Sequence, residues 1–429
     1  MLCQQTNLVN MPSPYKIANQ TVVRELNLSL VLRHLHDQTT LSRAQIAVST
    51  GLNKSTVSSL VDELIQRGLI HETGLNSGNA GRPATLLEIN PKAGGIVGLE
   101  LGVDFVSVVL TDFVGNIFWQ KTEDTDPTEK EDWTITQSLH LIDEAIQDCR
   151  SKGWRVLGVG LAIPGMVDVK EGILVFAPNL NWRNIPLKKI CAEHTGLPVF
   201  TDNDANAAAI GEHLFGVARQ TRDFIFVYAG IGIGGGLFLN NDLYRGKNGF
   251  AGEFGHTPII SGSFRVQEHE DGPGDWETYA SQNSIIRHVQ ASLQAKQSKI
   301  IPRLMEEQHA PLSISLIKEA ANAGDKVALD AFASTGEALG VGIANLVNTF
   351  NPDKVVLGGP LSAVGNYLLS SIQASVAKHS FPELSQYVEI LASKFGKDAS
   401  VIGAIALVVN DILSNPTHVE KEVMPTTSD

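Results

Sequence analysis

The fold class that we expect from this sequence is α/β, with a small N-terminal domain of helices and a β-hairpin, followed by two α/β lobes. Three observations predict it. Two short helical segments flank a glycine between residues 42 and 68. Strand-like and helix-like segments alternate from residue 96 onward, which predicts parallel sheets. Each half of this larger region opens with a glycine-containing β-hairpin pattern.

Length and composition describe an ordinary globular chain. Its 429 residues allow two or three domains, and 43% hydrophobic residues supply enough apolar side chains for sizeable cores. The three cysteines, Cys3, Cys149 and Cys191, lie far apart and form no Cys-x-x-Cys pair. This spacing indicates a reducing compartment and offers no thiolate metal site.

The sequence shows neither a secretion signal nor a membrane span. No basic segment followed by an apolar one opens the chain, so we expect no signal peptide and a cytoplasmic location. The longest apolar runs, 224–239 and 401–409, are interrupted by glycine or too short to cross a bilayer. We therefore expect no membrane partner.

Charge is distributed unevenly along the chain. Residues 1–90 carry a net charge of +1, whereas the whole chain carries −13, which leaves −14 for residues 91–429. Because the acidic part repels phosphates, only the N-terminal segment is expected to approach DNA.

The first 90 residues have the pattern of a helix-turn-helix. A first helix is expected over residues 19–36, with its apolar side formed by Val22, Val23, Leu26, Leu30 and Leu35. Ser42 is placed to cap a short helix that Gly51 ends, and Asn53 is placed to cap a second helix. Two short helices around a glycine turn predict a helix-turn-helix.

Polar side chains in the first turn of the second helix suggest DNA recognition. Such residues contact base edges and phosphates when a helix enters the major groove. Segments 69–71 and 85–89 predict a β-hairpin wing, whose tip can reach phosphate or the minor groove. The alternative is a helical protein-interaction module. The candidate DNA contacts are Ser42, Arg43, Asn53, Lys54, Ser55, Thr56, Ser58, Ser59 and, at the wing tip, Arg82.

Domain boundaries follow from these patterns. We place the DNA-binding domain at residues 1–90 and a first α/β lobe at residues 91–205, completed by a C-terminal helix over residues 400–413. The second lobe takes residues 206–399. Residues 415–429 are expected to form a disordered tail.

The stretch FTDNDANAAAIG, residues 200–211, combines a strand end with polar side chains and the start of a helix. Ligands of open α/β sheets bind at such carboxyl ends of strands. Asn203 offers two donors and an acceptor, and Asp204 offers acceptors only, which together suit vicinal hydroxyls. The simpler interpretation is an aspartate that caps the helix.

Several motifs together resemble the ROK family (repressor, open reading frame, kinase), which has the ribonuclease-H-like fold of actin and hexokinase. The resemblance covers nearly the whole chain, and within the family it is closest to the bacterial xylose-operon repressors. It implies a winged helix-turn-helix followed by a two-lobed sugar-binding domain. The motifs are IPGMVD (163–168), FAPNLNW (176–182), DNDANAAAIGE (202–212), GIGIGGG (230–236), YRGKNGFAGEFGH (244–256) and DWETYAS (275–281).

The resemblance also implies which side chains hold a sugar and a metal. Carried over by position, the sugar contacts are Asn203, Asp204, Glu253, His256 and Glu277, with Gly165 and Asn179 near the ring. Family members commonly hold one zinc with that histidine and three cysteines, but residues 262–275 contain no cysteine, and Asp275 stands at the last cysteine's position. We therefore expect no metal and no cofactor. A replacement site using His256 and His269 is the alternative.

Kinases of the family hold ATP phosphates with two Gly/Thr hairpins and deprotonate the sugar with an aspartate. The aspartate remains as Asp204. In the first hairpin, however, the pattern Asp-x-Gly-Gly-Thr has become Glu100-Leu-Gly-Val103-Asp104, which adds a branched side chain and a negative charge. Ile231 replaces the threonine of the second hairpin. We therefore expect neither ATP binding nor catalysis, and we interpret residues 234–236 as a tight hairpin.

Three functions remain to be distinguished. The first is a repressor that binds double-stranded operator DNA as a homodimer or homotetramer and responds to a monosaccharide, xylose or glucose. The second is a sugar kinase with an appended DNA-binding domain. The third is a constitutive DNA-binding protein whose sugar fold only supports assembly.

Overall fold

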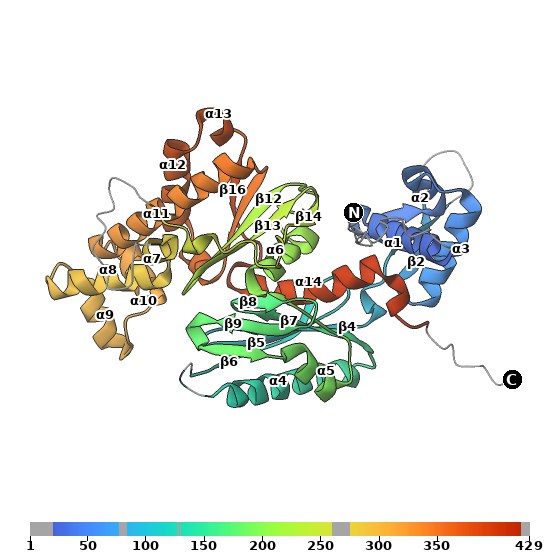
Figure 1. The fold of residues 1–429 in the computed structure, drawn as a ribbon, viewed down its shortest axis with the longest axis horizontal. Coiled ribbons are helices and arrows are strands. Elements are labelled where there is room, and N and C mark those ends of the chain that lie inside the picture. The colour runs from blue at the N-terminus through green and yellow to red at the C-terminus, as the bar shows by residue number, and fades with distance from the viewer. Residues whose placement is uncertain (1–19, 77–83, 127, 129, 260–274, 422–429) are drawn as a thin grey trace, which may run out of the picture. The chain divides into compact units, whose positions relative to one another are not determined.

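The computed structural model describes residues 20–76, 84–126, 128, 130–259 and 275–421, and the chain forms two compact units. The first unit combines residues 1–90 with residues 411–429, and the second comprises residues 91–410. Figure 1 shows the elements of both units.

The first unit contains the winged helix-turn-helix that the sequence predicts. Its helices are α1 (Gln20–Gln38), α2 (Arg43–Thr50) and α3 (Lys54–Gln66), and its sheet has the order β1-β3-β2. Gly51 ends α2 in the left-handed region at φ 73°, and the Asn53 side chain caps α3 by accepting from the Thr56 amide. The strands of this sheet are β1 (Thr40–Ser42), β2 (Ile70–Asn76) and β3 (Ala84–Ile89). The antiparallel pair β2 and β3 forms the wing.

The apolar side of α1 differs from the predicted one. Val22, Val23 and Leu26 are exposed, and the fully buried residues come from the second half of the helix: Leu28, Val31, Leu32 and Leu35. The prediction was wrong for the first turns because periodicity identifies an apolar face but not where the domain core begins.

The C-terminal segment also differs from the prediction. Residues 415–421, which we expected to be disordered, include the 3₁₀ turn η6 (Pro416–His418) and belong to the first unit. The Arg67 side chain, only 9% exposed, donates to the carbonyl oxygens of Thr417 and Val419 at 3.3 and 2.6 Å. Buried charge needs such partners, so these hydrogen bonds hold the segment in place.

The second unit begins with a five-stranded mixed sheet of order β11-β7-β4-β5-β6. Strands β11, β7 and β4 are parallel, as the alternation predicted, and β4, β5 and β6 form an antiparallel meander where a hairpin was predicted. The strands are β4 (Gly95–Leu101), β5 (Phe105–Thr111), β6 (Ile117–Asp124), β7 (Val156–Ile163) and β11 (Val199–Asn203).

Helices and a smaller sheet complete this first lobe. Helix α14 (Ala399–Ser414) packs closely on the sheet at Gly160. A side chain at this position would collide with the Ala404 carbonyl group, so glycine makes the close contact possible. The lobe also contains a three-stranded sheet of order β10-β9-β8. The remaining elements are α4 (Glu131–Ser151), α5 (Leu187–Thr195), β8 (Met166–Asp168), β9 (Ile173–Ala177), η2 (Pro178–Leu180) and β10 (Trp182–Ile185).

The second lobe has a five-stranded sheet of order β14-β13-β12-β15-β16. Its strands are β12 (Phe224–Ala229), β13 (Ile233–Leu239), β14 (Asp242–Leu243), β15 (Lys354–Gly358) and β16 (Glu389–Ala392). Its helices are α6 (Asp204–Phe215), α7 (Trp276–Ala280), α8 (Gln282–Gln294), α9 (Ile300–Gln308), α10 (Ile314–Asn322), α11 (Lys326–Phe350), α12 (Asn366–His379) and α13 (Pro382–Ser385).

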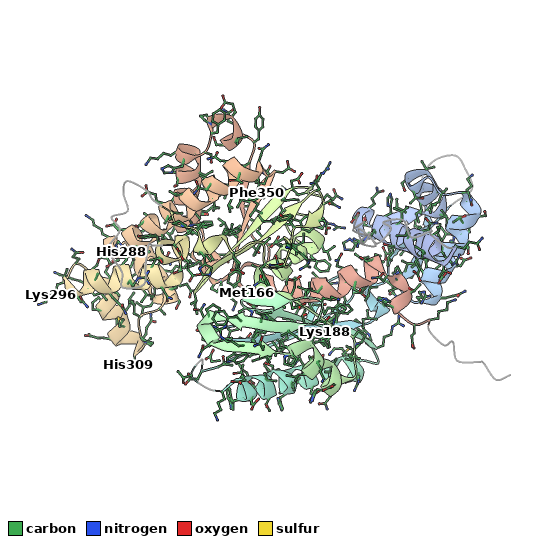
Figure 2. The ribbon with its side chains drawn as sticks, viewed as in Figure 1. Met166, Lys188, His288, Lys296, His309 and Phe350 are labelled. Carbon is green, nitrogen blue, oxygen red and sulfur yellow. The ribbon has the colours of Figure 1, made fainter. Side chains whose placement is uncertain are left out.

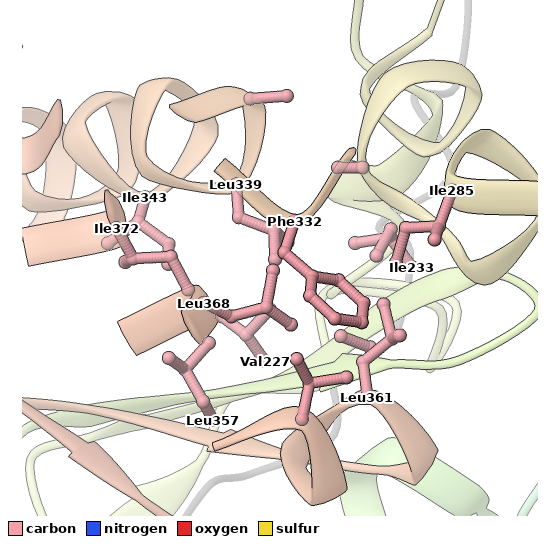
Figure 3. Close-up of a cluster of buried hydrophobic side chains, with 14 of the residues drawn as sticks. Val227, Ile233, Ile285, Phe332, Leu339, Ile343, Leu357, Leu361, Leu368 and Ile372 are labelled. Atoms are coloured by element: carbon pink, nitrogen blue, oxygen red, sulfur yellow. The ribbon is translucent and has the colours of Figure 1, made fainter. Parts of the chain in front are cut away.

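The core of this lobe lies between the sheet and the long helices. Figure 3 shows Phe332 and Leu339 of α11 packed with Val227, Leu357 and other apolar residues. Among the described residues, α11 alone is long and apolar enough to cross a membrane, but 72% of its most apolar window is buried in this core. Its apolar character is therefore explained by packing.

Gly234, Gly235 and Gly236 do not form the tight hairpin that we expected. They lie within β13, and the turn itself is at Gly230–Gly232, where the Gly230 amide donates to the Gly232 carbonyl. A side chain on Gly235 would collide with the Phe254 ring, and one on Gly236 would approach the Ala209 Cβ to 2.6 Å. These glycines allow close packing of a strand against its neighbours.

Candidate functional site

A cavity of about 580 Å³ lies between the two lobes of the second unit. Its walls come from the ends of β4, β7 and β11, from the start of α6, and from the turns and loops of the second lobe. Met166, labelled in Figure 2, belongs to the wall contributed by the first lobe. All seven sugar-site residues carried over from the sequence line it: Gly165, Asn179, Asn203, Asp204, Glu253, His256 and Glu277.

Asn203 is partly committed to the fold. Its side-chain oxygen caps α6 by accepting from the amides of Ala205 and Asn206 at 3.0 and 3.2 Å. Its side-chain nitrogen donates to the Gly165 carbonyl oxygen at 3.0 Å. The Asn203 side chain also hydrogen-bonds the Asp204 carboxyl, so it is more fully engaged within the protein than the sequence suggested.

Asp204 is the first residue of α6 and has an unusual protonation equilibrium. Burial, with a contribution from the nearby Glu253, raises the pKa of its carboxyl to about 7, although the Ala205 amide, which donates at 2.8 Å, acts to lower it. Burial disfavours the charged form of an acid, and a neighbouring negative charge does so as well. Asp204 can therefore present either a donor or two acceptors near neutral pH.

Glu253 and Glu277 place two more carboxylates on the same wall. Burial and Glu277 raise the pKa of Glu253, and His256 lowers it. Glu277 is held in place because its Oε2 accepts from the Ile233 amide at 2.9 Å. Carboxylates accept hydrogen bonds from hydroxyl groups, so a pair of them suits a polyol.

His256 lies beside Asp275, with Nδ1 3.7 Å from the carboxylate Oδ2. The structure shows no group of three metal-binding side chains among its described residues. The alternative site that would use His269 falls outside the described part of the chain. The His256 ring is exposed and is available to a ligand in the cavity.

Gly165 adopts a backbone conformation that only glycine tolerates well. Its φ is +80°, and a side chain there would collide with the Phe176 carbonyl oxygen. The carbonyl oxygen of Gly165 itself accepts the hydrogen bond from the Asn203 side chain. The polar wall therefore rests on a backbone turn with no room for adjustment. Asn179, on η2, is an exposed member of this wall.

The turn between β4 and β5 forms another wall of the cavity, and it contains the positions where kinases hold phosphate. Glu100 is 2% exposed, and burial raises its pKa well above the usual range, with Asp204 and Asp398 adding to the effect. Asp104 is exposed at the tip. The Phe105 ring lies over Gly102, where a side chain would collide with it. Backbone amides in this turn are thus covered on one side by an aromatic ring.

Among the cavity residues that were missed from the sequence, two aromatic ones matter for the chemistry of the site. Phe105 and Tyr228 both line the cavity. Burial raises the pKa of Tyr228 well above its usual range, and the carboxylates of Glu100, Asp204 and Asp104 raise it further. Phe105 is the first residue of β5, and Tyr228 is the second-last residue of β12, so each aromatic residue lies close to a glycine turn. The same pattern is common in ordinary hairpins.

The DNA-binding candidates divide into two groups. Ser42 is 6% exposed, and its hydroxyl and amide form a capping box with Gln45. Arg43 pairs with Glu72 and Asp62 at 2.8 and 3.1 Å. The Asn53 side chain is taken up by the cap of α3. The side chains of Ser42, Arg43 and Asn53 thus make contacts within the domain, and their assignment as DNA contacts stays a prediction.

The remaining candidates lie on one helix. Lys54 and Ser55 are exposed in the first turn of α3, and Thr56 and Ser58 are half-buried. Ser59 is exposed and accepts from Arg24 at 3.3 Å. Arg82 lies outside the described residues. The first turn of α3 is thus the surface suited to the major groove.

A winged helix-turn-helix joined to a two-lobed domain with a polyol-binding cavity defines a class: DNA-binding proteins built on a sugar-kinase fold. The family model described as ROK family matches residues 96–411, and that of the MarR family matches residues 29–78. The chain belongs to the ROK family.

Relatives within this family include both regulators and kinases. The xylose repressor of Bacillus spizizenii is 36% identical over 401 residues, which cover 92% of this chain and 98% of the relative. A crystal structure of a ROK family transcriptional regulator, a homolog of the Escherichia coli Mlc protein, is 29% identical with a TM-score of 0.78 and covers 92% of this chain and 99% of its own. The glucokinase of Streptomyces griseus, in complex with glucose and AMPPNP, is 32% identical with a TM-score of 0.64 and covers 73% and 99%.

Proposed function

We propose that this protein is a sugar-responsive transcriptional repressor that binds operator DNA and is released by a monosaccharide, without phosphorylating it. The observation that carries the proposal is the contrast within one cavity, where polar groups suited to hydroxyls remain and groups suited to phosphate are replaced. The similarity to xylose repressors makes xylose the first sugar to test and glucose the second. The site of action is the cytoplasm.

DNA binding is assigned to the first turn of α3. Lys54 is exposed there, next to Ser55. A two-fold protein places two such helices on two operator half-sites, so we propose a homodimer or homotetramer as the binding form. Lys54→Ala is expected to weaken DNA binding for all sequences and to reduce the salt slope by about one. Lys170→Ala, which removes an exposed lysine of the second unit, is the control.

An operator titration tests the sugar response. DNA upstream of sugar-utilisation genes is bound by the full chain, and fluorescence anisotropy is followed as sugars are added at millimolar concentration. Because coupling between two sites is typically about 1–3 kcal/mol, xylose is expected to weaken DNA binding by about 5- to 150-fold. A panel of aldopentoses and hexoses that leaves the DNA affinity unchanged would contradict the proposal.

A sugar kinase is the second candidate, and one observation favours it. Asp204, with a pKa of about 7, has the protonation behaviour of a general base and faces the cavity. Against it stand Asp104, which brings a negative charge toward any triphosphate, and the Phe105 ring over Gly102. A coupled assay for ADP with the sugar panel decides, since turnover above that of an Asp204→Asn control would establish a kinase.

A further inference from the structure

The cavity is larger than one monosaccharide requires. A pentose has about ten non-hydrogen atoms, and at the roughly 30 Å³ that each water occupies in the liquid it fills at most about 300 Å³. The cavity measures about 580 Å³. Roughly half of it therefore stays empty when the polar wall holds a single pentose.

Sheet topology places the unfilled part next to the β4–β5 turn. Strands β11, β7 and β4 are parallel neighbours, so their carboxyl ends lie in that order along one edge, followed by the turn into β5. With strands about 4.8 Å apart, Glu100 and the turn lie roughly 10–14 Å from Asn203. This distance exceeds the width of one sugar ring.

The chemistry of this second region suits a neutral sugar and opposes an anion. It offers the aromatic faces of Phe105 and Tyr228 together with the carboxylate of Asp104. Aromatic faces are electron-rich and pack against the C–H face of a pyranose, while carboxylates accept from its hydroxyls. Asp104, exposed in the turn, brings a negative charge to this region, so phosphorylated ligands are repelled.

We propose that the region formed by Val103, Asp104, Phe105, Tyr228 and Ile231 is a second sugar subsite, so that the cavity binds a neutral disaccharide more tightly than its monosaccharide unit. This inference rests on the proposed sugar response and extends it. The polar wall around Asn203 holds one unit, and the second unit occupies the space that a nucleotide takes in a kinase.

Calorimetry with the full chain tests the subsite. Xylose is compared with β-1,4-xylobiose, and glucose with cellobiose. One disaccharide is expected to bind at least about tenfold more tightly than its own unit, because a second ring adds apolar contact and hydrogen bonds. Phe105→Ala and, separately, Asp104→Asn are expected to remove this preference while monosaccharide affinity changes less than about threefold. Phe381→Ala, an exposed aromatic outside the cavity lining, is the control.

The outcomes separate the two proposals. Disaccharides that bind no more tightly than monosaccharides, or a preference that survives in both variants, overturn the second subsite and leave the monosaccharide response standing. If no sugar binds, the proposed function fails together with the subsite. Thermal unfolding of each variant is measured in parallel, and because Asp104 is exposed, Asp104→Asn provides a folded variant even where Phe105→Ala does not.

Discussion

Two walls of one cavity differ in how the chain holds them. The polar wall around Asn203 is fixed by side chain to backbone bonds: Asn203 to Gly165, and Glu277 to Ile233. The β4–β5 turn is held by main-chain bonds: the Gly102 amide donates to the Phe105 carbonyl, the Thr125 amide donates to the Asp104 carbonyl, and the Asp104 side chain is exposed. The polar wall is held by side-chain hydrogen bonds between different elements, whereas the turn is held by main-chain hydrogen bonds to neighbouring parts of the same meander.

This difference affects how much a substitution on each wall is expected to cost. A substitution at Asn203 or Glu277 alters a helix cap or a strand contact as well as the ligand site. A substitution at Asp104 changes an exposed side chain, whereas Val103 is partly buried against the core of the first lobe. A substitution at Asp104 is therefore expected to cost less stability than one at Asn203 or Glu277.

The largest expected effect separates the two walls by stability. Gly165→Ala forces a side chain into a positive-φ backbone and against the Phe176 carbonyl. We therefore expect the free energy of unfolding to fall by about 3 kcal/mol and sugar binding to be lost. Gly102→Ala meets only the Phe105 ring, which can rotate away, and is expected to cost about 1 kcal/mol or less. Urea unfolding measures both. Equal losses would show that the turn is as constrained as the polar wall.

The next effect separates the walls by ligand affinity. Glu253→Gln removes a charged acceptor from the polar wall, and hydrogen bonds to charged groups contribute about 1.5–3 kcal/mol, so xylose binding should weaken roughly 10- to 150-fold. Asp104→Asn, the matched carboxylate on the turn, should change xylose affinity less than about threefold. Calorimetry decides, and a larger effect at Asp104 would reverse the assignment of the two walls.

Asp204 is an electrostatic neighbour of both walls, and its protonation gives a pH-dependent effect. Its pKa of about 7 in the folded protein exceeds the usual 3.8, so the unfolded chain ionises first and the carboxyl lowers stability as pH rises from about 4 to 7. Asp204→Asn should therefore be more stable than the parent by about 1–2 kcal/mol above pH 7, with the advantage vanishing below about pH 4. Thermal unfolding across this pH range measures it. An advantage that does not depend on pH would show that the carboxyl is not the cause.

The smallest expected effect comes from rebuilding the turn. A triple variant, Val103→Gly, Asp104→Thr and Ile231→Thr, removes one negative charge and restores the glycine and hydroxyl groups. We expect weak ATP binding, with Kd near the millimolar range, where the parent shows none. Fluorescence titration with a labelled ATP analogue measures it. ATP binding by the parent itself would contradict the loss of the phosphate site.

The sequence predicts the elements of this fold well where local signals are strong. Asn53, Gly51 and the flanking helices were located correctly because caps and a glycine turn are local features. The burial of Leu28 rather than Val22 was not predictable, since it depends on where other elements pack. Residues of the polar wall were found through family motifs. Phe105 and Tyr228 were not, because only tertiary structure shows that they face the same space.

The hydrogen bonds between Arg67 and the segment after α14 have a practical consequence. The DNA-binding unit combines residues up to 90 with the segment that begins at residue 411, so a fragment ending at residue 90 would leave Arg67 paired with Glu63 but without its carbonyl acceptors on Thr417 and Val419. Chimeras that transplant this unit onto another sensor therefore require two splice junctions, one near residue 90 and one near residue 411.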